Sequence, residues 1–186
     1  MKKILFTLAS ALLTFGFGFS QTTEIPDRNF EQALIDLGYD SGDPDGFVLT
    51  TNINLITELN VSNKSITDLT GIEGFTDLTS LDCYSNELTS LDVSNNTALT
   101  SLYCYGNQLT SLDVSNNTAL TILYCYSNEL TSLDVSNNTA LDWLYCYGNK
   151  LTSLDVNNNT ALTSLICGSN QLTSLDVSNN TALTIL

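Results

Sequence analysis

The sequence predicts a β-solenoid in which a parallel β-sheet is preceded by a short helical N-terminal cap. Three observations lead to this fold class: a repeat that covers most of the 186 residues, leucines fixed within it, and one amphipathic segment upstream. The only five cysteines of the chain mark the repeat because they stand 21 residues apart. They are Cys83, Cys104, Cys125, Cys146 and Cys167.

Aligned on the cysteines, the chain gives five full units, which are residues 78–98, 99–119, 120–140, 141–161 and 162–182. The second unit reads LTSLYCYGNQLTSLDVSNNTA. Its period lies within the roughly 20 to 29 residues that are typical of leucine-rich repeats. One unit cannot bury its own leucines, so successive coils must stack at ~4.8 Å to close a core. The two asparagines of each unit then also form columns, whose amides can satisfy backbone groups at the turns.

Each unit is a near-doublet, because LxxLxCxxN is followed ten residues later by LxxLDVxxN, so either half could form the sheet. Residues 56–77 favour the first half, since this leading unit keeps the first pattern and departs from the second. The cysteine half is therefore predicted to form the strands, and the other half to return along the opposite side. We expect about six coils, with in-register parallel strands around residues 80–84, 101–105, 122–126, 143–147 and 164–168.

The domain organisation follows from this repeat. Residues 21–55 form an N-terminal cap, and residues 56–186 form the repeat domain. Within the cap, Asp27 can begin a helix that runs to Leu37, with an apolar stripe and a stop at Gly38. The stripe consists of Phe30, Ala33, Leu34 and Leu37. Leu186 stands in the middle of a sixth unit, so we expect the natural protein to be longer.

The first twenty residues are predicted to be a secretory signal peptide. Lys2 and Lys3 precede an uncharged apolar stretch, and Gly18 and Ser20 provide a small-residue cleavage site. A membrane anchor is the weaker alternative, because the stretch is short for a membrane span. We therefore expect a protein that is secreted or displayed on a bacterial cell surface, with no membrane insertion.

The charge balance excludes several classes of function. The net charge of −15 becomes −17 when the two lysines of the signal peptide are removed. Such a surface repels nucleic acids and anionic lipids. The chain has no histidine, so it lacks the commonest general base and the commonest neutral metal ligand. No nucleophile–base arrangement can be built, and we expect no enzyme activity, no cofactor and no metal.

The five cysteines are interpreted as a structural ladder of reduced, buried side chains. Equivalent side chains on neighbouring coils lie about one strand spacing apart, ~4.8 Å, which exceeds the ~3.8 Å between the Cβ atoms of a disulfide. A straight column also cannot surround a metal ion tetrahedrally.

The aromatic residues give the clearest indication of a binding site. Seven of the eight tyrosines and the only tryptophan fall on the outward positions of the predicted strands. Exposed aromatic patches mark interaction sites, although stacked rings also stabilise a sheet. We expect the centre of the site at Trp143, Tyr145, Tyr124 and Tyr147, whose rings would share one flat patch and point to solvent. The candidate ligand-binding residues are Tyr103, Tyr105, Tyr124, Tyr126, Trp143, Tyr145 and Tyr147.

Two acidic features leave a calcium site open as an alternative. One is a column of aspartates in the second half-unit, whose like charges repel one another. Hydrogen bonds from neighbouring hydroxyls and backbone N–H groups can offset this repulsion, or the carboxylates can bind calcium. Residues 41–52 also loosely match a calcium loop, but Asn52 stands where a bidentate glutamate is needed, which favours a polar turn. The column consists of Asp92, Asp113, Asp134, Asp155 and Asp176.

The repeat resembles that of the internalin group of bacterial surface proteins, in its period, its LDVSxNT sequence and its one cysteine per unit in place of a core leucine. The resemblance covers residues 56–186, and the cap segment IPDRNFEQALIDLGYD is similar to caps of Bacteroidetes-type secreted repeat proteins. It implies adhesion or protein recognition at the cell surface without specifying the ligand.

We therefore expect a monomeric, non-enzymatic recognition or adhesion module that binds a protein or glycan through the aromatic-rich sheet face. The alternatives are a structural spacer for a larger protein, or its substrate-binding part, with a further or catalytic domain beyond Leu186.

Overall fold

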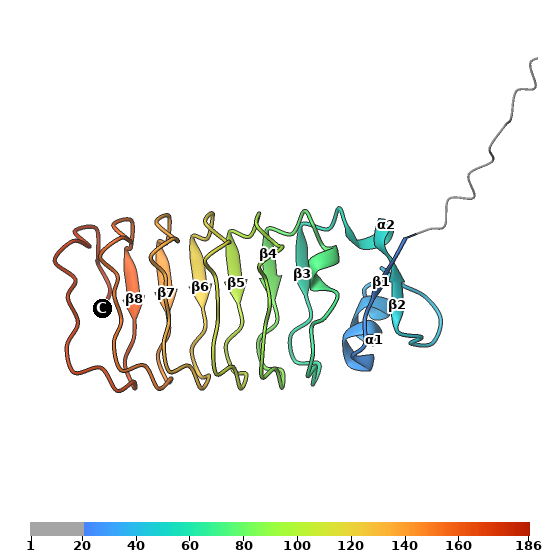
Figure 1. Cartoon of the computed structure of the whole chain (residues 1–186), viewed down its shortest axis with the longest axis horizontal. Helices are drawn as coiled ribbons and strands as arrows, with labels where there is room; N and C mark the ends of the chain where they lie inside the picture. The colour runs from blue at the N-terminus through green and yellow to red at the C-terminus, as the bar shows by residue number, and fades with distance from the viewer. Residues whose placement is uncertain (1–20) are drawn as a thin grey trace, which may run out of the picture.

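The computed structural model describes residues 21–186, which form a cap followed by stacked coils (Figure 1). The predicted signal peptide lies outside the described residues. Each coil contributes one strand to a six-stranded parallel sheet, in which strands adjacent in sequence are neighbours. The strands are β3 (Glu58–Asn60), β4 (Ser80–Asp82), β5 (Ser101–Tyr103), β6 (Ile122–Tyr124), β7 (Trp143–Tyr145) and β8 (Ser164–Ile166).

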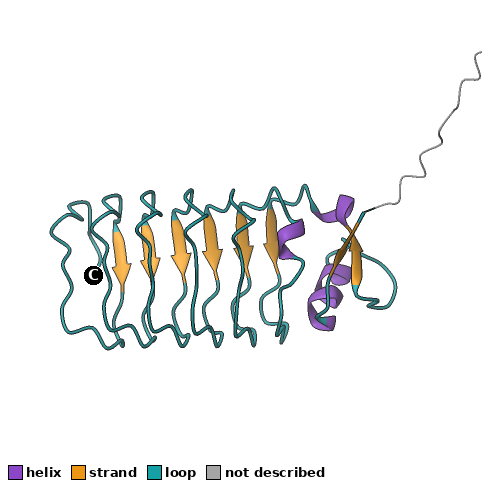
Figure 2. Cartoon of the chain, viewed as in Figure 1, coloured by secondary structure: helices purple, strands orange, loops and turns teal. Residues whose placement is uncertain are grey.

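The register of the sheet follows the repeat. Leu81 pairs with Leu102, and Leu102 pairs with Leu123, so equivalent residues of successive coils meet. The cysteine half of each unit forms the strands, as predicted, and the second half has only an isolated bridge between Asp92 and Asp113 (Figure 2). After β8 the chain continues into a further turn, where Ile185 pairs with Ser164. The fold class and the phase of the repeat are therefore confirmed.

The regular strands have three residues, whereas the pattern predicted five. Backbone bonds nevertheless continue past the strand, because the N–H of Cys83 donates to the carbonyl of Tyr103 at 2.9 Å. The residue after the outer tyrosine then takes a left-handed conformation, with φ of 52° at Ser85 and 65° at Gly106. This conformation turns the chain away from the sheet and ends the strand.

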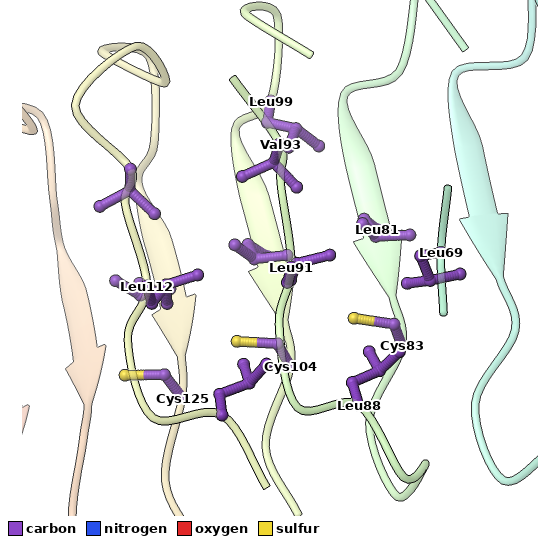
Figure 3. Packing of buried hydrophobic residues seen from close by; sticks show 14 of the residues in the cluster. Leu69, Leu81, Cys83, Leu88, Leu91, Val93, Leu99, Cys104, Leu112 and Cys125 are labelled. Carbon is purple, nitrogen blue, oxygen red and sulfur yellow. The ribbon is translucent and has the colours of Figure 1, made fainter. Parts of the chain in front are cut away.

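The core consists of columns that run along the solenoid (Figure 3). Leu81, Leu99 and Val93 are fully buried, and so is Cys104, which occupies a leucine-like position. Because each column repeats in every coil, one coil covers the apolar side chains of the next. The core is therefore continuous from the cap to β8.

One asparagine column satisfies the turns on the cysteine side. The side-chain amide of Asn107 donates to the carbonyls of Cys83 and Cys104, both at 3.0 Å. Its Oδ1 accepts the N–H of Leu88 at 3.1 Å. Each of these asparagines thus joins its own coil to the preceding one, as its donor and acceptor chemistry predicts.

The second asparagine column is bonded less completely. Asn117 donates to the carbonyls of Val93 and Asn96, at 3.0 and 2.9 Å. Its Oδ1 receives no hydrogen bond from the residues that the structure describes, and the same holds for its equivalents in other coils. Its contribution to stability therefore rests on two donated bonds.

The cap contains the predicted helix and an unpredicted antiparallel pair of strands. The helix α1 (Arg28–Asp36) begins at Asp27, whose Oδ1 accepts the N–H groups of Asn29 and Phe30. The strands β1 (Thr22–Glu24) and β2 (Phe47–Leu49) pair with each other, and the short helix α2 (Thr50–Ile53) follows.

Phe30 packs against Phe75 of the first coil, beside the short 3-10 helix η1 (Ile72–Gly74), with ring centroids 6.4 Å apart. The cap thereby covers the end of the core. Leu37 is 44% exposed, so its assignment to the apolar stripe was wrong. Gly38, with φ of 80°, ends the helix as predicted, since this conformation disfavours side chains with a Cβ. No helix among residues 21–186 has the length and apolar character needed to span a membrane.

Candidate binding face

The outward positions of the sheet form three columns, because side chains alternate between the two faces of a strand. Trp143 belongs to the first column, Tyr145 to the second and Tyr147 to the third, on and just after β7. We use the name aromatic face for the tryptophan and the seven tyrosines of these columns. Its residues are Tyr84, Tyr103, Tyr105, Tyr124, Tyr126, Trp143, Tyr145 and Tyr147.

The third column is a continuous stack of tyrosine rings. Tyr84 and Tyr105 have centroids 4.4 Å apart and planes within 5°. Tyr126 continues the stack at 4.3 Å from Tyr105, and Tyr147 follows 4.4 Å further on. Parallel rings at this separation lie face to face, so each ring covers much of its neighbour.

The second and first columns meet around Tyr124. Its ring is parallel to that of Tyr145, at 4.4 Å, and perpendicular to that of Tyr103, at 5.2 Å. The Trp143 ring is parallel to Tyr124 at 6.5 Å. Tyr145 also hydrogen-bonds with Ser164, with 3.2 Å between the two hydroxyl oxygens.

This geometry corrects the expectation of a flat patch of rings that point to solvent. Stacked tyrosines hide their faces from solvent and present ring edges and hydroxyls. Tyr124, Tyr145 and Tyr147 are each half-buried, whereas Trp143 is 42% exposed. The structure thus places all the predicted site residues on one surface, and their mutual packing also stabilises the sheet.

The electrostatics of the face differ along the sheet. Toward the cap, Asp82 stands in the second column, and Glu58 lies on the neighbouring strand. Burial, followed by repulsion from Glu58, raises the pKa of Asp82. Burial likewise raises the pKa of Tyr124 to about 12, with a further contribution from Tyr145, so this hydroxyl stays protonated at neutral pH. Neither Asp82 nor Glu58 was among the residues predicted for the site.

The cysteines form a column on the inner side of the same strands. Cys83, Cys104, Cys125 and Cys146 are buried, and Cys167 is partly buried. Burial raises the pKa of Cys83 to about 12, and it raises the pKa of the other cysteines of the column too. Protonated, buried thiols are poor nucleophiles.

The aspartates of the acidic column, on the side of the solenoid opposite the sheet, accept hydrogen bonds within their own turns. The N–H of Ser94 donates to Asp92 at 2.9 Å, and the same bond recurs in every later unit. Hydrogen bonds from the side chain and backbone of Ser94 lower the pKa of Asp92, with the same cause at Asp113 and Asp134. Shallow hollows between coils adjoin this column, lined by serine and aspartate.

Hydrogen bonds to other residues of the cap hold the 41–52 segment in place. The carboxylate of Glu31, which is 1% exposed, accepts the N–H groups of Asp45 and Gly46 at 2.6 and 2.8 Å. Asn52 donates to the carbonyl of Tyr39 at 3.0 Å. These bonds favour the polar-turn interpretation. Within residues 21–186, no group of three or more acidic or cysteine side chains is placed to hold a metal ion.

Together, the stacked coils, the parallel sheet and the column of cysteines define an internalin-like leucine-rich-repeat protein with a cysteine ladder. Over 42 residues the chain is 52% identical to internalin J of Listeria monocytogenes serotype 4b (strain F2365), a match that covers 23% of this chain and 5% of that relative. No protein-family profile matches the chain.

Solved structures extend this similarity over the whole fold. The functional domain of InlJ from Listeria monocytogenes, which includes a cysteine ladder, is 35% identical, with a TM-score of 0.61. That match covers 90% of this chain and 47% of the other. A leucine-rich-repeat protein of Leptospira interrogans is 26% identical, with a TM-score of 0.69, over 74% of this chain and 38% of that one. The chain therefore spans less than half the length of these relatives.

Proposed function

We propose that the chain is a secreted or cell-surface recognition module and that it binds a protein or glycan through the aromatic face. The observation that carries the proposal is the gathering of seven tyrosines and the only tryptophan on one surface of the sheet. Tyrosine and tryptophan are the residues that contribute most to binding at protein interfaces. The similarity to internalins supports the same function, since these are surface recognition and adhesion proteins.

The exposure of Trp143 favours binding over a purely structural role for the face. Its ring is 42% exposed, and its column otherwise holds serine in three of the five units, so the repeat does not require an aromatic residue there. The absence of histidine from the chain fits a module that binds rather than catalyses. The spacer alternative predicts that no ligand depends on this face.

The test is a binding survey with purified residues 21–186. The wild type is applied to arrays of glycans and of bacterial and host surface proteins, beside the variants Trp143→Ser and Tyr147→Ser. We expect the signals of the wild type to fall at least ten-fold in both variants. Thr131→Ala, an exposed change on the opposite side of the solenoid, is the matched control and should bind as the wild type does.

Circular dichroism melting curves of all variants show whether each one is folded. If folded Trp143→Ser and Tyr147→Ser keep every signal of the wild type, the aromatic face is not the binding site.

A further inference from the structure

The aromatic face has unequal ends, and the end nearest the cap is acidic. Glu58 on β3 and Asp82 on β4 both occupy outward positions of neighbouring strands. Beyond Asp82 the second column continues into Tyr103, with which Asp82 is paired in register. The opposite end of the face carries Ile166 and Gly168 instead, neither of which is charged.

The two carboxylates are not explained by the fold. Glu58 pairs in register with Ser80 and Asp82 with Asn60, so the two carboxylates are diagonal neighbours on adjacent strands, and repulsion from Glu58 adds to the burial that raises the pKa of Asp82. The two ion pairs among residues 21–186 join Lys64 to Asp36 and Lys150 to Glu129, so neither involves Glu58 or Asp82. In the acidic column of the opposite side, each aspartate accepts a backbone N–H, but no such bond reaches Asp82 within the described chain. The cap end thus carries a like-charge repulsion that the protein itself does not offset.

The rings beside these carboxylates suit a cation. Tyr84 begins the third column, and the corresponding residue of the preceding coil is Ser62, so among the described residues its ring stacks with Tyr105 alone. Arginine stacks on aromatic faces and pairs with carboxylates, so one guanidinium can use both features. Sugars, by contrast, need open ring faces, and most ring faces of this surface are covered by stacking.

We propose that the aromatic face binds a basic segment of a protein, with an arginine of that segment lying beside Asp82 and the outer side of Tyr84, and with Glu58 adding to the negative charge of this end. This inference rests on the proposed function and deepens it, because it names the class of partner. The net charge of −17 that residues 21–186 carry attracts such a segment from a distance, and the aromatic rings toward Trp143 contact its apolar side chains.

Trp143 provides the readout, since it is the only tryptophan of the chain and lies on this face. The probe is the synthetic peptide acetyl-Arg-Gly-Phe-Gly-Arg-amide, which contains neither tyrosine nor tryptophan. We expect a saturable change in Trp143 emission, and we expect the double variant Glu58→Gln/Asp82→Asn to weaken binding at least five-fold. The matched control is Asp113→Asn/Asp134→Asn, which removes the same charge from the opposite side and should change the affinity less than two-fold.

Stability gives a second readout. If the carboxylates serve a ligand, Asp82→Asn should raise the melting temperature of the free protein, because it removes a repulsion. A lower melting temperature would instead show a structural role and would overturn the inference. Equal weakening in both double variants, or no saturable response at millimolar peptide, would overturn it too.

Cello-oligosaccharides and chito-oligosaccharides form the comparison arm. If these sugars and not the peptide change the Trp143 emission, the partner is a glycan, and the inference fails while the proposed function stands. If the array signals do not depend on Trp143, the proposed function itself fails.

Discussion

The rings of Tyr124 and Tyr145 lie parallel, within 1°, with their centroids 4.4 Å apart. The Tyr145 hydroxyl also reaches Ser164 on the next strand. Tyr145 therefore joins three neighbouring strands, whereas the Trp143 ring stacks with Tyr124 and its strand position is flanked by Ile122 and Ser164. These two residues of the aromatic face thus differ in how much the fold depends on them.

Tyr145→Ser is expected to destabilise the protein by about 1–2 kcal/mol, because it removes a stacked pair and a partner of Ser164. Trp143→Ser should cost less than about 1 kcal/mol, since its ring is 42% exposed. Urea unfolding of each variant measures both free energies. The ranking is wrong if Trp143→Ser proves the more destabilising of the two.

Cys125→Ser tests the cysteine column. The side chain is fully buried, so a hydroxyl in its place loses solvation, and we expect a cost on the order of 1–3 kcal/mol. Cys125→Ala is the control for lost volume alone. Thiol titration in denaturant should also find five free thiols per chain, and fewer would reveal disulfide bonds that contradict the ladder.

The two asparagine columns should contribute unequally to the free energy of unfolding. Asn107→Ala leaves the buried N–H of Leu88 without a partner, while the carbonyls of Cys83 and Cys104 keep the amides of Asn86 and Asn128. Asn117→Ala loses two donated bonds and also removes an unpaired oxygen. We expect Asn107→Ala to lower the free energy of unfolding by about 1 kcal/mol more than Asn117→Ala, because it leaves one additional buried group without a hydrogen bond. Equal unfolding free energies would show that the two columns are equivalent.

The cap should weaken in acid through Asp27. Burial raises the pKa of this carboxyl, but hydrogen bonds from Thr67, Phe30 and Asp68 outweigh that effect, so its pKa in the folded state lies below 3.8. The stabilisation it gives is therefore complete above pH ~3.8 and is lost as the pH falls through the lower, folded-state pKa.

Melting temperatures measured between pH 7 and pH 2 test this expectation. Asp27→Asn should lower the melting temperature at neutral pH, and it should flatten the decline in acid. Asp43→Asn is the control, since Asp43 is exposed. A decline in acid as steep in Asp27→Asn as in the wild type would assign the effect to other carboxyls.

The sheet could be predicted from the sequence because the repeat fixes which residues meet. A period of 21 brings Cys104 beside Cys83 and Cys125, and every other column follows from the same register. The departure of residues 56–77 from the doublet was enough to identify the strand-forming half. The repeat could not predict whether the aromatic rings lie flat on the sheet or stack on one another, because the spacing of residues in the sequence does not determine how each ring is rotated.

The cap was less predictable, since it does not repeat. The pairing of Thr23 with Val48 joins three-residue strands that show no sustained alternation. Glu31 has the sequence context of an exposed helical residue, yet its carboxylate is buried and holds the 45–46 backbone. Both features depend on a loop whose course no periodicity describes.

The constant register has a consequence for how such a protein can change its length. Because each residue of a coil meets its counterpart 21 positions on, any excision of 21 residues between 78 and 161 rejoins two coils without a mismatch. Such a change shortens the molecule by one strand spacing, about 4.8 Å. It also removes one complete row of the aromatic face, so that duplication and loss of units change the area of this face in whole steps.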